Sequence, residues 1–224
     1  MLHNSQKLPR ALTVSQTELT IKRLIDVSIA LMGLFLLSPV MGFISLLIFV
    51  SMGSPILFRQ DRPGWNCEPF VLLKFRTMNE VHDEKGRLLD DDRRLTHLGR
   101  FLRRWSLDEL PQLINVIKGE LSLVGPRPLL MEYLDRYSPE QLRRHEVKPG
   151  ITGWTQVKGR NALTWEEKFA LDIWYVDNWS LLLDAKILLL TLIAVLKGEG
   201  IGHQDQVTMP EFFGTKGNTA QKET

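Results

Sequence analysis

Cysteine is almost absent from this sequence, and several kinds of site are excluded with it. Cys67 is the single cysteine, so an internal disulfide cannot form, as suits a reducing compartment. The five histidines are scattered, and with one cysteine they cannot build a Cys/His metal cluster. No zinc-finger or RNA-binding signature occurs, and the net charge is only +2, so nucleic acid is not an expected partner. Repeats, low-complexity tracts, P-loops and dinucleotide-binding fingerprints are also missing.

What the chain does have is one long apolar run, Leu24–Val50, whose only charged residue is Asp26. A straight helix of this length measures about 40 Å, against about 30 Å for the bilayer core. The run is too long for a signal peptide, and no cleavage site of small residues follows it. We therefore predict a membrane anchor.

The anchor can enter the membrane in two ways, and the sequence leaves both open. Ser38-Pro39 lies at mid-run, where proline removes a backbone donor and kinks or breaks a helix. The Ser38 hydroxyl can pair with the freed carbonyl. Basic residues lie on both sides of the run, which favours placing both ends in the cytoplasm. A helix broken at Ser38-Pro39 that leaves by the side it entered satisfies these features, and a kinked span is the alternative.

The rest of the chain is long enough for one domain, and we predict an α+β, predominantly helical fold. The predicted organisation is a loose tail over 1–20, an anchor over 21–52, a catalytic domain over 53–200, and an uninformative tail over 201–224. Apolar periodicity and turn residues predict strand–turn–strand over 55–75, an acidic loop over 79–92, helices over 93–105, 108–118, 129–146, 164–178 and 181–196, and short strands and turns over 148–161.

The predicted helix 93–105 has an apolar stripe and an arginine-rich face. Such a helix can lie along an anionic membrane surface, although a solvated basic face on a core helix explains the same pattern. The apolar helix 181–196 contains Asp184 and Lys186, which favours a core or interfacial position over a membrane span.

The segment Ser106–Pro111 is the strongest candidate for chemistry. Ser106 and Glu109 have the spacing of a capping box, and Asp108 could itself cap the helix that follows. A helix N-terminus also favours an ionised carboxylate, so Asp108 can be a charged, oriented nucleophile. Glu109 beside it adds an oxygen ligand for Mg²⁺, which in proteins prefers one or two carboxylates plus substrate phosphates.

Phosphate ligands also require cations, and several are available. Proline on both sides of Arg127 fixes its backbone, which favours bidentate phosphate binding, although a surface turn would look the same. Ordinary surface charge remains an alternative for Lys74 and Arg76. The glycine-rich stretch around Arg160 could wrap a nucleotide or sugar, or form plain turns. Asp172 is a weaker candidate, because core packing is the favoured explanation of the aromatic residues near it. The full set of predicted substrate-binding residues is Lys74, Arg76, Arg103, Arg127, Arg160 and Asp172.

Taken in order, the motifs resemble the bacterial sugar transferase family, the monotopic phosphoglycosyl transferases, over about residues 20–198. The motifs that carry the resemblance are Lys22-Arg23 with Asp26, Ser38-Pro39, Lys74–Met78, Ser106–Gln112, Gly125–Pro128 and Pro149–Gly153.

The resemblance implies a reaction as well as a fold. The anchor would be re-entrant, in the bacterial inner membrane with the catalytic domain on the cytoplasmic face. Asp108 would attack a UDP-sugar, release UMP and pass the phosphosugar to undecaprenyl phosphate. Asp108 and Glu109 would bind Mg²⁺, and Lys74, Arg103 and Arg127 would surround the phosphates. Membrane lipids and downstream glycosyltransferases are the other expected partners.

Two alternatives need different residues or a different kinetic order. A non-catalytic membrane-anchored adaptor, binding lipid head groups or partner enzymes through the basic helix, would need the arginines but not Asp108. A direct transfer in a ternary complex would need both substrates bound together, with no covalent intermediate on Asp108. The sequence does not specify the sugar, the glycan pathway or the oligomeric state.

Overall fold

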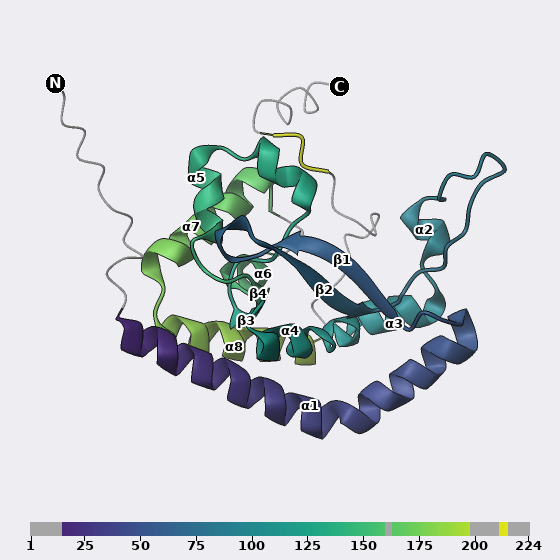
Figure 1. Cartoon of the computed structure of the whole chain (residues 1–224), viewed down its shortest axis with the longest axis horizontal. Coiled ribbons are helices and arrows are strands. Elements are labelled where there is room, and N and C mark those ends of the chain that lie inside the picture. Colours follow the sequence, from purple (N-terminus) through teal and green to yellow (C-terminus); the bar gives the residue numbers. More distant parts are fainter. Residues whose placement is uncertain (1–14, 160–162, 198–210, 215–224) are drawn as a thin grey trace.

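The computed structural model describes residues 15–159, 163–197 and 211–214. It is mostly helical with two small sheets, as predicted (Figure 1). The helices are α1 Gln16–Met52, α2 Asp91–Arg94, α3 His97–Arg104, α4 Gln112–Lys118, α5 Pro139–Leu142, α6 Trp154–Lys158, α7 Trp165–Asn178 and α8 Leu181–Leu196. The strands are β1 Leu57–Pro63, β2 Pro69–Phe75, β3 Ser122–Val124 and β4 Gly150–Thr152. Short 3-10 segments are η2 Trp65–Cys67, η3 Leu107–Glu109, η4 Met131–Arg136 and η5 Arg143–His145.

Helix α1 begins earlier than predicted. Ser15 caps it, and Glu18 completes the capping box, so residues 16–20 are helical rather than part of a loose tail. The Ser-x-x-Glu spacing was present in the sequence and was missed, because these residues precede the apolar run.

The helix also passes through Ser38-Pro39 without a gap, so the predicted break is a bend instead. Figure 1 shows α1 changing direction near its middle. Pro39 has no N–H to donate to the carbonyl of Phe35, and the Ser38 hydroxyl donates to that carbonyl at 2.8 Å. The predicted role of Ser38 is therefore confirmed, and its bond explains how the helix stays continuous.

One side of α1 packs against the rest of the molecule, and the opposite side is exposed. Only 11% of the residues in its most apolar 18-residue stretch are buried, and this helix is long and apolar enough to cross a membrane. Phe35 is 80% exposed and Val50 is 76% exposed. An exposed apolar face of this extent is unfavourable in water, as expected of a surface that meets lipid.

Both ends of α1 are fixed to the same domain. Near its start, Lys22 pairs with Asp184 of α8 at 2.5 Å, and Arg23 donates to the carbonyls of Val116 and Ile117 at the end of α4. Asp26 accepts from the Ser122 hydroxyl at 2.8 Å, so it also ties α1 to β3. Near the other end, Ile44 and Ile48 pack with Phe75 and Leu102. The helix therefore spans the underside of the domain (Figure 1).

Both sheets are small, and α4 packs against a strand of each. Strands β1 and β2 form an antiparallel hairpin, as predicted, whereas β3 and β4 pair in parallel. The fully buried Asn115 on α4 donates to the carbonyl of Val71 at 2.8 Å and accepts from the N–H of Leu73 at 3.1 Å. These bonds fix the strand that carries Lys74 against α4.

Three predicted helices are divided in the structure, and of these residues 108–118 form the end of η3 followed by α4. Residues 93–105 are split at Leu95-Thr96, because Leu95 bridges to Met78 and Thr96 starts a new helix by capping the N–H of Gly99. Residues 129–146 form η4, α5 and η5, since Ser138-Pro139 starts α5 with its own cap. Helices α7 and α8 match their predicted ranges within one residue, and α8 buries Ile187 while leaving Leu182 exposed.

Candidate active site

Asp108 and Glu109 lie in the 3-10 turn η3, between α3 and α4. The predicted capping box at Ser106 is wrong: Ser106 has φ 54°, in the left-handed region, and its side chain makes no cap bond. This conformation stands between the end of α3 and η3, and Pro111 then leads into α4. The two acids are thus held in a sharp turn rather than as the cap of a long helix.

Glu109 is the anionic centre of the site. One of its oxygens, Oε1, accepts from Lys74 Nζ at 2.6 Å and also from the guanidinium of Arg127. Burial raises the pKa of Glu109, but Arg127 and Lys74 outweigh it and hold the pKa well below its usual range. Glu109 therefore stays ionised and joins strand β2 to the loop after β3.

Asp108 lies beside this pair in different surroundings. It is only 6% exposed, and its carboxylate reaches Lys74 no closer than 4.0 Å. Burial, followed by repulsion from Glu109, raises the pKa of Asp108, while Lys74, Arg103 and Arg127 oppose the rise. Burial and Glu109 therefore decide the direction in which the pKa of Asp108 moves.

Arg103 lies on α3 and acts on Asp108, whereas Arg76 follows β2 and binds elsewhere. Arg103 donates to the Thr77 hydroxyl at 3.1 Å; burial lowers its pKa, and Asp108 is the foremost charge that offsets this. Arg76 donates to the carbonyls of Met52 and Met78 at 3.2 and 3.1 Å, which fastens the end of α1. Both residues line the cleft described below, and their phosphate-binding roles remain predictions.

Asp172 acts on the site through a second arginine. It pairs with Arg144 at 2.6 Å, where both side chains are almost fully buried, and accepts from Thr155 at 2.6 Å. Arg144 in turn donates to the backbone carbonyl of Arg127 at 2.8 Å. Asp172 therefore supports the loop Gly125–Pro128 after β3, called here the Arg127 loop. Arg160 lies outside the described residues.

The Arg127 loop is also held by close backbone contact. A Cβ on Gly125 would lie 2.3 Å from the carbonyl oxygen of Lys148, so only glycine allows this approach. The parallel pairing of β3 with β4 continues into this contact. Arg127 is thus placed opposite Lys74 by backbone packing rather than by its own side chain.

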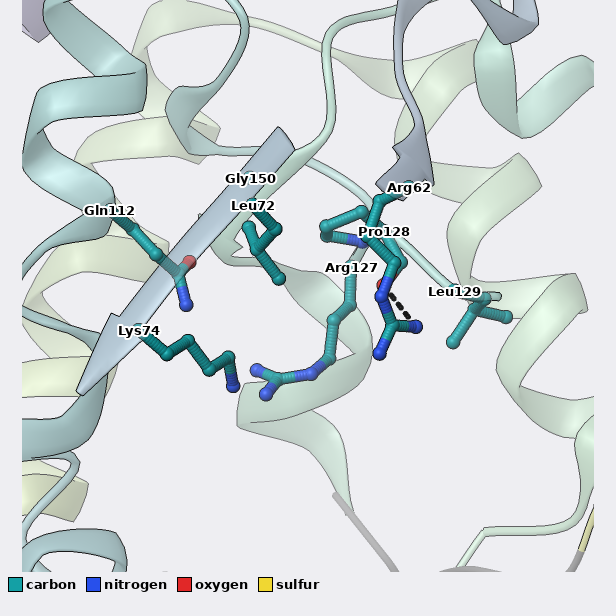
Figure 2. A pocket seen from close by; sticks show the side chains of 8 residues that line it. All are labelled: Arg62, Leu72, Lys74, Gln112, Arg127, Pro128, Leu129 and Gly150. Carbon is teal, nitrogen blue, oxygen red and sulfur yellow. Dashed lines mark hydrogen bonds between the residues drawn. The ribbon is translucent and has the colours of Figure 1, made fainter. Parts of the chain in front are cut away.

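These groups line one extended cleft of about 1830 Å³. It runs from Met41 and Ser45 on α1, past Asp108 and Glu109, to Trp165 on α7. A smaller hollow of about 80 Å³ opens beside it, and Figure 2 shows Lys74 and Arg127 pointing toward one another there, with Arg62 alongside. The cleft thus joins an apolar end at α1 to a charged centre.

The residues fit the way in which proteins hold Mg²⁺. In the described ranges no group of three His, Cys, Asp or Glu residues could hold a metal ion. Mg²⁺ nevertheless commonly uses one or two carboxylates together with substrate phosphates and water. Asp108, which is buried, and Glu109, which is half-buried, lie side by side at the wall of the cleft and supply such a pair.

Comparison with known proteins places the chain in a family. The family model described as bacterial sugar transferase matches residues 17–198. The chain belongs to the bacterial sugar transferase family. The match extends from the start of α1 to just beyond α8, so it includes the anchor, the acidic pair and the arginine loop of this sugar transferase.

Three relatives illustrate the range of this family. The uncharacterized sugar transferase EpsL of Bacillus subtilis (strain 168) is 55% identical over 195 residues, covering 87% of this chain and 96% of EpsL. The exopolysaccharide production protein ExoY of Sinorhizobium fredii (strain NBRC 101917 / NGR234) is 40% identical over 80% of this chain and 87% of ExoY. The UDP-glucose:undecaprenyl-phosphate glucose-1-phosphate transferase of Escherichia coli (strain K12) is 40% identical over 77% of this chain but 39% of that enzyme. The sugar transferase described here therefore corresponds to less than half of the longer relatives.

Sequence reasoning missed two arginines of this sugar transferase. Arg144 is buried and Arg62 is half-buried beside the Arg127 loop. Neither lies in a sequence motif that predicts a chemical role. Arg144 lies within a segment that was predicted to be plain helix. Only the fold brings it within reach of Asp172, which is 28 residues away.

Proposed function

We propose that this protein transfers a sugar-1-phosphate from a UDP-sugar to undecaprenyl phosphate and releases UMP. Relatives with 40% and 43% identity are named as transferases of glucose-1-phosphate from UDP-glucose to this lipid, which supports the substrate classes. The observation that carries the proposal is the placement of Asp108 in a cleft beside a carboxylate clamped by two cations.

In the first step, a carboxylate oxygen of Asp108 attacks the sugar-bearing phosphorus of the UDP-sugar. A bond forms between that oxygen and phosphorus, the bond from phosphorus to the bridging oxygen breaks, and UMP leaves with the electron pair. Lys74, Arg103 and Arg127 surround Asp108 and stabilise the charge on the phosphate oxygens. Because the pKa of Asp108 is raised, its carboxylate is more basic than an ordinary one, which favours nucleophilic attack.

In the second step, a phosphate oxygen of the lipid attacks the phosphosugar on Asp108. The bond between phosphorus and the Asp108 oxygen breaks, which returns the free carboxylate and yields a lipid-linked diphosphosugar. Both steps take place at the same phosphorus atom beside Asp108, so one set of cations serves both substrates in turn. Glu109 keeps Lys74 and Arg127 aligned between the steps.

Asp108 and Glu109 are also the residues that would hold Mg²⁺. When bound, the ion supplies positive charge that neutralises the diphosphate and orients it. The chain's own contribution is to place two carboxylates at the wall of a cleft whose other groups are cationic.

The proposal includes a re-entrant anchor in the bacterial inner membrane, with the catalytic domain on the cytoplasmic face. Support comes from the two ends of α1, which contact one domain, and from its bend at Pro39. A straight span would carry the ends to opposite sides of a bilayer about 30 Å thick. In this arrangement the cleft at Met41 and Ser45 lies where a lipid phosphate meets the charged centre.

The Asp108→Asn variant tests the reaction. The wild type and the variant are incubated with Mg²⁺, undecaprenyl phosphate and a panel of UDP-sugars, beginning with UDP-glucose and UDP-galactose, and UMP release is measured. The variant is expected to lose at least about 1,000-fold in rate, because an amide is a poor nucleophile. Retained biological function in Asp108→Asn cells would favour the membrane-anchored adaptor instead.

The covalent intermediate has its own test. The wild type is incubated with the UDP-sugar but without lipid, digested, and searched by mass spectrometry for a phosphosugar on Asp108. If UMP forms only when both substrates are present and no adduct accumulates, a one-step transfer in a ternary complex replaces the two-step scheme.

A further inference from the structure

Arg62 stands at the end of β1, where its guanidinium borders the small hollow between Lys74 and Arg127. Figure 2 shows the three cationic side chains around this space. They arrive from three segments, since Arg62 lies near the end of β1, Lys74 lies on β2 and Arg127 follows β3. Convergence of like charges is unfavourable unless an anion lies between them.

The bonds of Arg62 leave most of its charge unmatched. Its guanidinium donates to the side chain of Gln60 at 2.6 Å and, at the long distance of 3.5 Å, to the carbonyl of Pro128. Its Nε is buried and has no partner in the part of the chain that the structure describes. A buried donor without an acceptor is rare in folded proteins and calls for a partner that comes from outside the chain.

The charge count around the hollow points the same way. Glu109 is shared by Lys74 and Arg127, and Asp108 is the other carboxylate near them. Arg62 pairs with neither, and burial together with repulsion from Arg127 lowers the pKa of Arg62 to about 10. A bound anion would offset both the burial of the Arg62 guanidinium and its repulsion from Arg127.

The size of the hollow limits what that anion is. Its volume of about 80 Å³ exceeds the about 10–15 Å³ that one water requires, so it accommodates a group of several heavy atoms. An Arg fork and a lysine together match the tetrahedral oxygens of phosphate. The hollow also opens beside the cleft that contains Asp108.

We infer that Arg62 is a further substrate-binding residue, which together with Lys74 and Arg127 binds a phosphate monoester in this hollow. The inference rests on the proposed function, in which two such groups visit the site: the phosphate of UMP, and the phosphate of the lipid acceptor. When either phosphate occupies the hollow, the neighbouring Asp108 can still carry the phosphosugar.

The test compares Arg62→Ala and Arg62→Lys with the wild type and with Arg87→Ala, which removes the same charge from an exposed side chain outside the cleft. Two quantities are measured: the rise in melting temperature that UMP produces in the absence of other substrates, and KM for undecaprenyl phosphate. Arg62→Ala is expected to weaken one or both kinds of binding by about tenfold, whereas Arg87→Ala stays within about twofold.

The two readouts also identify the source of the phosphate. Loss of UMP stabilisation alone assigns the hollow to the nucleotide, a raised lipid KM alone assigns it to the acceptor, and both together assign it to each in turn. Arg62→Lys keeps the charge but loses the planar fork, so it is expected to lie between the wild type and Arg62→Ala. If Arg62→Ala does not fold, the same measurements on Arg62→Lys test the inference.

Values for both Arg62 variants within about twofold of the wild type would overturn the inference. The stabilisation by UMP needs no turnover, so it can be read even from a preparation that releases no UMP. Failure of the proposed reaction and failure of the Arg62 site therefore give different results.

Discussion

Asp108 and Glu109 are neighbours in the chain, but their surroundings give them opposite electrostatic properties. Glu109 is clamped by Lys74 and Arg127, so its charge stabilises the fold. Asp108 is buried against Glu109 with Lys74 at 4.0 Å, so its charge is tolerated rather than needed by the fold. Such a division is common where a site is built for reaction instead of stability.

Removing each charge should therefore change stability in opposite directions. Asp108→Asn is expected to raise the free energy of unfolding of the substrate-free protein by about 1 kcal/mol at neutral pH. Glu109→Gln is expected to lower it by about 2–3 kcal/mol, because Lys74 and the half-exposed Arg127 lose their anion. Denaturant unfolding in detergent measures both, and a destabilised Asp108→Asn would contradict this account.

The pH dependence follows from the same two shifts. A raised pKa means that Asp108 holds its proton more tightly when folded, so the stability it contributes falls as pH rises above the ordinary aspartate range. Glu109 has a lowered pKa, so its contribution is present at neutral pH and is lost as pH falls below the ordinary glutamate range.

For catalysis, only the charged form of Asp108 can attack. We expect the acid limb of the kcat/KM profile for UMP release to lie above the pKa of a free aspartate, because burial and Glu109 raise that of Asp108. The residual activity of Glu109→Gln should show the limb displaced to lower pH, since one repulsive charge is gone. An unmoved or higher limb would mean that Glu109 does not set the titration of Asp108.

At the scale of single elements, α3 is placed by its close approach to the end of β2. A Cβ on Gly99 would lie 2.0 Å from the carbonyl oxygen of Thr77, and Thr77 also binds Arg103. The backbone of α3 therefore rests directly on the segment that follows Lys74. This contact sets where Arg103 meets Asp108.

Gly99→Ala should accordingly force α3 away from Thr77. We expect a loss of about 2–3 kcal/mol in unfolding free energy and a drop in UMP release, because backbone atoms cannot yield as a side chain can. Gly42→Ala in α1 is the matched control for stability, since its added Cβ would meet nothing within 4 Å. Equal effects of the two alanines would show that lost backbone freedom, not the close contact, decides the result.

At the scale of the whole molecule, a short segment near the C-terminus closes the aromatic core over α7. Phe212 is fully buried among Tyr133, Tyr137, Trp165 and Phe169. Its N–H donates to the Tyr133 hydroxyl at 3.2 Å, and Arg136 pairs with Glu211 at 2.7 Å. The segment was uninformative as sequence, yet it supports Trp165 at the far wall of the cleft.

Phe212 and Phe213 provide a matched pair of neighbouring aromatics. Phe212→Ala should destabilise the protein by about 3 kcal/mol, because it leaves a cavity between the four other packed rings. Phe213 is 50% exposed and contacts Arg136 through its ring face, so Phe213→Ala should cost less than about 1 kcal/mol. Thermal unfolding of both variants in detergent decides this, and equal losses would show that the segment is not anchored by Phe212.

Local signals in the sequence were sufficient for much of this molecule. The apolar run determined α1, turn residues determined the β1–β2 hairpin, and caps with helical periodicity determined α7 and α8, because each of these depends on neighbours a few residues apart. The acidic pair and its basic surroundings could be named for the same reason, and the order of the motifs indicated the family.

Tertiary structure alone decided how those residues act. The Ser-x-x-Glu spacing predicts a cap at Ser106, but Ser106 adopts a left-handed conformation between α3 and η3 and makes no cap bond. Arg144 and Arg62 meet the Arg127 loop only after folding, and the raised pKa of Asp108 comes from burial that no local pattern encodes. Burial and long-range charge contacts depend on segments that are distant in the chain, so they are fixed by packing and not by sequence spacing.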